Sequence, residues 1–297
     1  MKKFFFKILL FFAIVIFIDF CVGHLGDYLQ LHAKGGDSRA LNDFVMKDNY
    51  DIVIFGSSRA HHHYDTPFLS DTLDMNIYNA GYDGNGIILA CGLLELIIDR
   101  YHPKLIIYDV EPIFDINEYE GDNNHKRYIK NLKPFFRNDS VASIIKDISC
   151  EEWYKVHSGM IRYNSDIISL IMDNLIARPT PSMGYVPLHG SLSSYSSEDD
   201  AIENKIDYFK LKYFEKMISL VKKNNIPIVV LASPMYGART SSSLSPVFDI
   251  CKKKNIRVYD YYIDSRFQHM ELFHDAGHMN EKGAREFSRQ IICDFLQ

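Results

Sequence analysis

The sequence predicts an α/β fold: a parallel sheet of about five strands, covered by helices on both faces. Short apolar runs that stop at glycine or polar residues alternate with segments whose apolar residues recur at helical spacing. Strands separated by helices pair in parallel, because each helix carries the chain back to the starting edge of the sheet. The five expected strands cover residues 52–55, 76–79, 104–110, 226–231 and 256–259.

Each expected strand has its own local signal. The run Ile52 to Phe55 is continuously apolar and ends at Gly56, which is typical of a strand buried on both faces. Residues 76–79 end shortly before Gly81, and Pro103 precedes the third strand. The expected helices cover residues 58–73, 87–101, 202–223, 245–254 and 281–296.

The alternation of strands and helices stops between residues 114 and about 200. This stretch contains aromatic-rich helical pieces and ends in a polar loop at residues 191–200, so we interpret it as a mostly helical insertion. The expected organisation is an N-terminal anchor at residues 1–24, a polar and partly helical connector at 25–49, and a domain at 50–297 that contains the insertion at about 114–200.

The N-terminal segment predicts a transmembrane helix. Lys2, Lys3 and Lys7 precede an apolar run from Ile8 to Val22 that only Asp19 interrupts. Counted from Phe4, the run reaches roughly 28 Å as a helix, close to the bilayer core of about 30 Å. By the positive-inside rule the lysines place the N-terminus in the cytoplasm and the rest of the chain outside it. A cleaved signal peptide is the first alternative, although no A-x-A pattern follows the run, and a buried core helix is the second.

Composition excludes some functions. The chain has 297 residues with 47% hydrophobic and 24% charged residues, which is ordinary for a globular protein. Its net charge of -5 argues against a nucleic-acid partner. The five cysteines include no CxxC pair, and their odd number without regular spacing argues against a disulfide framework, although a single bridge stays open.

Three residues predict nucleophilic catalysis. Ser58 follows the first expected strand at a turn into a helix, and Asp275 and His278 stand three residues apart before the last helix. A serine hydroxyl needs a base to become a nucleophile, and a carboxylate on the far nitrogen of that base fixes its tautomer. We therefore expect Ser58, His278 and Asp275 to form a catalytic triad. Singly, each motif also fits an ordinary turn or helix cap.

Other residues near the same expected sheet edge are candidates for substrate binding. Arg59 beside the nucleophile suits an anionic group, and Ser233 follows the fourth strand. Tyr82 suits a sugar face, and His62 could orient the substrate. Three consecutive histidines, at residues 61–63, cannot all face one ion from a regular helix, so neither a metal nor another cofactor is expected.

The motifs resemble those of the SGNH (GDSL-like) hydrolase superfamily, whose fold is a three-layer, flavodoxin-like sheet. Gly56-Ser57-Ser58 is similar to its first block, with Ser57 where Asp is commoner, and Asn79-Ala80-Gly81 is similar to the second. Asp275 and His278 are similar to the fifth. The Gly-Ser-Ser variant resembles a membrane-anchored branch that includes the D-alanine transfer protein of teichoic acid synthesis. The resemblance implies an oxyanion hole built from the N–H groups of Ser58 and Gly81, with Asn79 as a further candidate.

The third block departs from this pattern. The family has Gly-x-Asn-Asp there, and its Asn side chain donates to the oxyanion, whereas this strand ends Tyr108-Asp109-Val110-Glu111-Pro112. A carboxylate cannot donate unless it is protonated, so the third donor is either missing or supplied from elsewhere. Asn79, Asn85 and Arg59 are the nearby candidates.

The resemblance and the anchor together predict an extracytoplasmic esterase or O-acyltransferase in a bacterial inner membrane. Its expected substrate is an acyl group, most simply acetyl, on a cell-surface glycan, and a membrane acyltransferase is a further expected partner. Two alternatives stay open: a non-catalytic partner in polysaccharide modification that keeps the fold, and a lipid-directed esterase or thioesterase.

Overall fold

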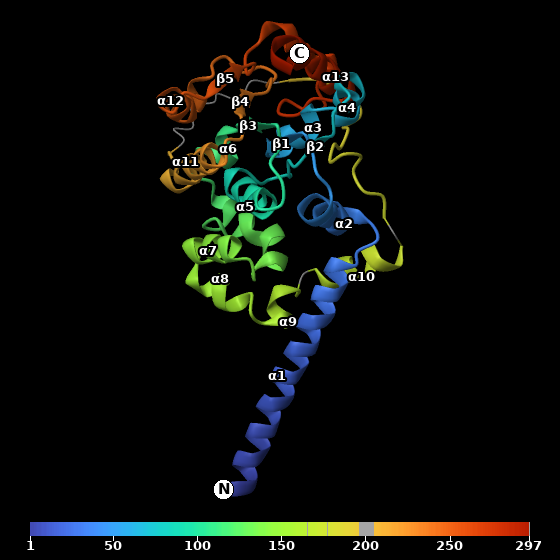
Figure 1. Cartoon of the computed structure of the whole chain (residues 1–297), viewed down its shortest axis with the longest axis vertical. Helices are drawn as coiled ribbons and strands as arrows, with labels where there is room; N and C mark the ends of the chain where they lie inside the picture. Colours follow the sequence, from blue (N-terminus) through green and yellow to red (C-terminus); the bar gives the residue numbers. More distant parts are fainter. Residues whose placement is uncertain (165, 177, 196–204, 297) are drawn as a thin grey trace. The chain divides into compact units, whose positions relative to one another are not determined.

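The fold is α/β, with five parallel strands in the order β2-β1-β3-β4-β5. The computed structural model describes residues 1–164, 166–176, 178–195 and 205–296, and helices lie on both sides of the sheet (Figure 1). The strands are β1 (Ile52–Gly56), β2 (Ile77–Asn79), β3 (Leu105–Asp109), β4 (Ile228–Ala232) and β5 (Arg257–Asp260). All five expected strands are confirmed to within two residues at each end.

The described part of the chain also contains helices before, between and after the strands in the sequence. They are α1 (Lys2–Leu31), α2 (Gly36–Asn42), α3 (Ser58–His63), α4 (Thr66–Leu73), α5 (Ile87–Ile98), α6 (Pro112–Asp115), α7 (Asp139–Ile148), α8 (Cys150–Lys155), α9 (Gly159–Arg162), α10 (Ile167–Leu175), α11 (Tyr208–Lys223), α12 (Ser245–Lys253) and α13 (Glu281–Ile291). Short π-helical turns at Asp43–Lys47 and Ile292–Leu296 continue α2 and α13.

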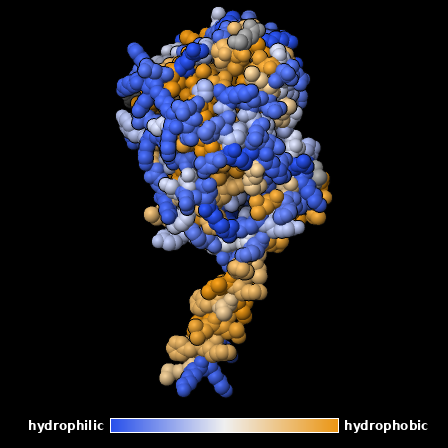
Figure 2. Space-filling model, viewed as in Figure 1, coloured by the Kyte–Doolittle hydropathy of each residue, from blue (hydrophilic) through white to orange (hydrophobic). Residues whose placement is uncertain are grey.

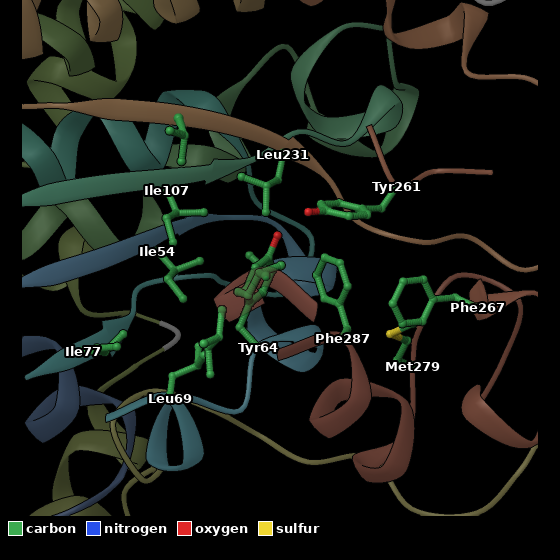
Figure 3. Close-up of a cluster of buried hydrophobic side chains, with 14 of the residues drawn as sticks. Ile54, Tyr64, Leu69, Ile77, Ile107, Leu231, Tyr261, Phe267, Met279 and Phe287 are labelled. Atoms are coloured by element: carbon green, nitrogen blue, oxygen red, sulfur yellow. The ribbon is translucent and has the colours of Figure 1, made fainter. Parts of the chain in front are cut away.

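Both faces of the sheet are buried, which explains why the strands are continuously apolar. On one face, Ile54, Ile107 and Leu231 pack with side chains of α3, α4 and α13, among them Leu69 and Phe287 (Figure 3). On the other face α5 packs against α11, and the ring of Tyr108 meets that of Phe214 edge-on at 5.5 Å. Packing on both faces therefore fixes the positions of the central strands and of the residues directly after them.

The order of the strands creates a switch point between β1 and β3. From β1 the chain first crosses to β2 on one side and then returns to β3 on the other. In open α/β sheets the loops that leave the carboxyl ends of the strands diverge at such a point, and ligands bind there. Gly56, with a φ of 153°, ends β1; a Cβ at this position would lie 2.6 Å from the carbonyl oxygen of Asp109. Glycine thus allows β1 and β3 to remain close where the chain turns toward Ser58.

Some element boundaries differ from those expected. The helix expected at residues 58–73 is broken at Tyr64, because Asp65 caps a new helix and Pro67 stands in its first turn. The helix expected from residue 202 begins at Tyr208, where the Asp207 side chain accepts from two backbone N–H groups. Residues 202–204 lie outside the described part of the chain.

The chain divides into two compact units. One consists of Met1–Lys47 and Ile129–Thr180, and the other of Asp48–Tyr128 and Pro181–Gln297. The expected organisation differs in two respects: α1 continues past residue 24 to Leu31, and the stretch expected as an insertion at about 114–200 is divided between the units. The physical reason is that α9 and α10 pack against α1, so the middle of the insertion belongs with the N-terminal segment.

Candidate active site

Ser58 lies at the start of α3, directly beyond the carboxyl end of β1. Ser57 caps this helix, its Oγ accepting from the N–H of Arg59 at 3.4 Å. The N–H of Ser58 lies in the first turn, where no carbonyl of the same helix is available to accept it. The Ser58 side chain is thus presented on a short, capped helix beside the switch point of the sheet.

The structure brings the three expected catalytic residues together. Ser58 Oγ lies 2.7 Å from His278 Nε2, and His278 Nδ1 lies 2.9 and 3.0 Å from the two carboxylate oxygens of Asp275. Because Nδ1 faces a carboxylate, it carries the proton of the neutral ring, and Nε2 is left to accept from Ser58. This is the geometry in which a serine hydroxyl is activated by a histidine base.

Asp275 is held in place by the loop that carries it. Its Oδ1 accepts from the backbone N–H groups of Gly277 and His278, at 2.8 and 2.9 Å. Partial burial opposes the charged form, but the hydrogen bond and the charge of His278 outweigh it and lower the pKa of the Asp275 carboxyl. Asp275 is therefore ionised at neutral pH and can stabilise the imidazolium that forms when His278 takes a proton.

A series of buried hydrogen bonds supports the loop that carries His278. The N–H of Met279 donates to His63 Nε2 at 3.0 Å, and His63 Nδ1 donates to Ser233 Oγ at 2.9 Å. Ser233 Oγ then donates to Asp109 Oδ2 at 2.7 Å. Complete burial, together with the charge of Arg59, lowers the pKa of His63 well below its usual value, so the ring stays neutral.

Two residues expected to bind substrate belong instead to this supporting series of hydrogen bonds. Arg59 is only 2% exposed; its guanidinium donates to the carbonyl and hydroxyl of Ser233 and lies 5.0 Å from the centre of the Tyr262 ring. Ser233 is fully buried as well. The expectation that Arg59 and Ser233 contact substrate is therefore wrong in this structure, because both side chains are buried and hydrogen-bonded to each other. His63 and Asp109 were missed, and only the run of three histidines pointed toward the former.

His62 lies beside His278, and Tyr82 lies beside His61. The ring of His62 meets that of His278 edge-on, with 5.6 Å between centroids, and its two nitrogens face the carbonyl of Val186 at 2.7 Å and Asp83 at 3.1 Å. Although burial opposes the charged form, Asp83 and the Val186 carbonyl raise the pKa of His62. Tyr82 is half-buried and its ring stacks near that of His61.

Among the residues that the structure describes, two groups of side chains have donor atoms close enough to hold a metal ion. His61, His62 and Asp83 form one group, and Asp122, His125 and Asp207 form the other; within each group the donor atoms lie within 4.8 Å of one another. In the second group the Lys210 ammonium lies 3.4 Å from Asp122, so a cation of the chain itself already balances these carboxylates.

The expected oxyanion donors are only partly available. The N–H of Gly81 donates to Asn79 Oδ1 at 3.0 Å, and Asn79 Nδ2 donates to the carbonyl of Ala60 at 2.6 Å. Asn79 thus braces the turn after β2, and the expectation that its amide faces the oxyanion is wrong in this structure. Of the expected oxyanion donors, the backbone N–H of Ser58 remains, because no carbonyl of its own helix accepts from it.

Glu111 is the residue of this edge that sequence reasoning did not place. It follows β3, and its Oε2 is hydrogen-bonded to Ser57 Oγ. Burial raises the pKa of Glu111 to about 8, and the neighbouring carboxylates of Asp115 and Asp109 add to this against the opposing charge of Arg59. The signal that could have found it was the unusual end of the third strand.

Similarity searches find resemblance in three dimensions only. No family model and no curated protein sequence matches the chain. A psychrotrophic esterase, EstA, from Pseudoalteromonas sp. aligns with 82% of this chain and 96% of its own, at 12% identity and a TM-score of 0.41. A putative lipolytic protein of the G-D-S-L family from Desulfitobacterium hafniense aligns with 80% of this chain and 96% of its own, at 11% identity and a TM-score of 0.40.

The acetyl xylan esterase AlAXEase is similar to a comparable degree. It aligns with 82% of this chain and 99% of its own, at 10% identity and a TM-score of 0.39. At this level of similarity neither family membership nor activity transfers to the chain. Its function has to be inferred from its own side chains.

Proposed function

We propose that the chain is a serine-type acyl esterase or O-acyltransferase anchored in a membrane. The observation that carries the proposal is the continuous set of contacts from Ser58 Oγ through His278 to Asp275 at the carboxyl edge of the sheet. The contact between Ser58 and His278 joins residues 220 positions apart in the sequence. Neither motif's ordinary role as a turn or helix cap requires that contact.

The geometry supports a two-step reaction. Ser58 Oγ attacks the acyl carbonyl carbon as His278 Nε2 takes the hydroxyl proton, and the carbonyl oxygen becomes an oxyanion. The tetrahedral intermediate then collapses, the C–O bond to the leaving alcohol breaks, and His278 returns the proton to that alcohol. Water or an acceptor hydroxyl attacks the resulting acyl-serine in the second step, with His278 again as the base. The acceptor decides between hydrolysis and transfer.

The first experiment is labelling of the full chain in detergent micelles with a fluorophosphonate probe. We expect labelling of the unaltered protein, none with Ser58→Ala, and strongly reduced labelling with His278→Ala. His274→Ala is a matched control, because His274 is exposed in the same loop and its Nδ1 bonds only the carbonyl of His189. If the unaltered protein is not labelled, the enzyme proposal fails and a non-catalytic binding role replaces it.

The membrane part of the proposal depends on α1. This helix is long and apolar enough to cross a bilayer, and its 30 residues reach about 45 Å, more than the hydrocarbon core needs. Figure 2 shows an apolar surface along its N-terminal part that ends in a hydrophilic tip. Lys2 and Lys3 are the first two residues of this helix. We infer that this part spans the membrane with the N-terminus in the cytoplasm.

The C-terminal part of α1 argues for a retained anchor over a cleaved signal. Asp19 accepts from Ser158 Oγ at 2.6 Å and from the N–H groups of Gly159 and Met160, which begin α9. About two turns further along α1, Asp27 accepts from Arg162 at 2.9 Å and from Tyr163 at 2.6 Å. Removal of α1 would take the acceptors away from Gly159, Arg162 and Tyr163, which are buried in this structure. Each buried donor left without a partner costs about 1–3 kcal/mol.

Tags on both ends and surface labelling test the topology. We expect both tags on a single polypeptide in a blot, and we expect this polypeptide to stay in the membrane fraction after alkaline extraction. A membrane-impermeant maleimide should label the exposed Cys150 and Cys293 from outside the cytoplasm in intact cells. Loss of the N-terminal tag, or labelling only after lysis, would overturn the anchor or its orientation respectively.

A glycan-bound acyl group, most simply acetyl, is the proposed substrate. An anchored enzyme meets surface polymers at high local concentration, which favours slow acyl transfer on tethered substrates. Release of acetate from acetylated envelope polysaccharide, compared with transfer to an unacetylated acceptor, distinguishes esterase from transferase. Activity on long-chain acyl esters alone would favour the lipid-directed alternative.

A further inference from the structure

The candidate active site is short of hydrogen-bond donors for the charge it must stabilise. A tetrahedral intermediate on Ser58 carries a full negative charge on the former carbonyl oxygen, and fixed donors aimed at that oxygen provide much of the catalysis. The Ser58 N–H is available, but the Gly81 N–H is taken by Asn79, and the Asn79 amide is taken by Ala60. A further donor at the same edge would relieve this shortage.

Glu111 occupies the corresponding position on the neighbouring strand. Gly56 of β1 pairs with Asp109 of β3, and Ser58 and Glu111 each follow two residues after this pair. The two strands flank the switch point of the sheet, where bound ligands are expected. The bond between Ser57 Oγ and Glu111 Oε2 shows that the carboxyl group does reach back toward the nucleophile's own turn.

The surroundings of Glu111 favour its neutral form. Three acidic groups, Asp109, Glu111 and Asp115, lie together at this end of β3, and Arg59 is the cation among the groups that act on Glu111. Asp115 accepts from the N–H groups of Ile87 and Glu111 and from the hydroxyl of Tyr108, as suits an ionised carboxylate.

The carboxyl group of Glu111 lacks comparable support. Among the described residues, it accepts a hydrogen bond from the hydroxyl of Ser57 alone. A carboxylate with one neutral donor, among other acids and mostly out of water, is costly to ionise, and the raised pKa of about 8 agrees with this. Its proton is then available for a hydrogen bond to an anionic oxygen.

We propose that the carboxyl group of Glu111, holding its proton, is a donor in the oxyanion hole and a catalytic residue of this site. The proposal rests on the esterase or acyltransferase function proposed above. The Glu111 O–H donates to the developing oxyanion and keeps its proton, so no bond of Glu111 breaks during the cycle. Burial among carboxylates destabilises the ionised form of Glu111. The neutral carboxyl group that results can donate a hydrogen bond to a negative charge on the substrate. A carboxylic acid kept neutral in an apolar site serves the same purpose in ketosteroid isomerase.

The test is the pH profile of ester hydrolysis by the full chain in micelles, with 4-methylumbelliferyl acetate as the probe. For the unaltered protein we expect kcat to fall as the pH rises through about 8, as Glu111 loses its proton. Glu111→Gln keeps a donor that does not titrate, so it should retain activity within about tenfold and lose the alkaline fall. Glu111→Ala should lower kcat by about 10²–10³-fold with little change in KM, as removal of one oxyanion donor does.

Glu118→Gln serves as the control for a glutamate-to-glutamine change, because Glu118 is exposed and pairs with Lys205. The proposal is overturned if Glu111→Ala keeps the kcat and the alkaline fall of the unaltered protein, or if Glu111→Gln loses as much kcat as Glu111→Ala.

The two proposals fail in different ways. If fluorophosphonate labels Ser58 but the Glu111 variants behave as the unaltered protein does, the active site stands and Glu111 has a structural role. If no labelling and no hydrolysis occur in the unaltered protein, the proposed function fails first. Circular dichroism identifies any variant that loses activity because it does not fold. If Glu111→Ala is such a variant, the pH profile of Glu111→Gln, whose side chain is similar in size, decides whether Glu111 is a donor.

Discussion

Replacement of Asp275 by asparagine tests the catalytic chain most directly. The carboxylate holds the proton of His278 on Nδ1, so that Nε2 is free to accept from Ser58. An asparagine amide would favour the opposite tautomer and turn the base into a donor toward Ser58. The variant also removes the negative charge that stabilises the imidazolium, 2.9 Å away in this structure.

The size of the effect follows from these two terms. The Asp275 side chain is about half exposed, so its charge acts through an effective dielectric constant between that of a protein surface and that of water. At about 3 Å this gives roughly 1.4–5.5 kcal/mol. With the tautomer change we expect Asp275→Asn to lower kcat by about 10³-fold, with KM nearly unchanged.

Steady-state hydrolysis of 4-methylumbelliferyl acetate measures the effect, with Glu271→Gln, an exposed acid shortly before the same loop, as the control. A loss of less than about tenfold in kcat would refute the assignment of Asp275 as the residue that orients His278.

Three further results are expected. His63→Ala removes two buried hydrogen bonds and leaves a cavity, so the free energy of unfolding should fall by roughly 3–5 kcal/mol in denaturant titrations, with His61→Ala, nearer the surface, changing it by less than 1 kcal/mol. Asp27→Ala leaves Arg162 buried beside α1 without its partner, and should make the segment 129–180 more sensitive to limited proteolysis; equal cleavage rates would contradict the proposed role of α1. Because the pKa of Glu111 is raised, its contribution to stability is complete below its ordinary pKa and is lost as the pH rises through about 8. The stability of the unaltered protein relative to Glu111→Gln should therefore decrease from about pH 5 to about pH 9, and a constant difference would show that Glu111 ionises normally.

The elements of the sheet were accessible from local patterns. The residues of β1 are apolar at every position because both faces of the strand are covered, and Gly56 marks its end. Such signals lie within a few neighbouring residues, so the sequence carries them directly. The same holds for α1, whose apolar run and flanking lysines are consecutive.

Local patterns were misleading where a side chain had a choice of partners. Arg59 beside the nucleophile suggested a substrate contact, but the tertiary structure turns its guanidinium toward Ser233, 174 positions away. His63 is one of three consecutive histidines that look alike in the sequence, yet it alone is fully buried and supports the loop of His278. The order of the strands decides these contacts, and periodicity does not encode it.

Local sequence patterns were enough to place a serine at the tip of a buried strand, and an aspartate and a histidine three residues apart before the last helix. Hydrophobic periodicity and turn residues act over a few positions, so these features survive without any knowledge of the fold. Three contacts became visible in the folded chain alone: Ser58 meets His278, Asn79 accepts from the Gly81 N–H, and Glu111 reaches Ser57 from the neighbouring strand. Those contacts depend on the register between β1 and β3 and on the burial that the packed helices impose. Burial also shifts the pKa of Glu111, because the cost of ionising a carboxyl group depends on the atoms around it and not on its neighbours in the chain.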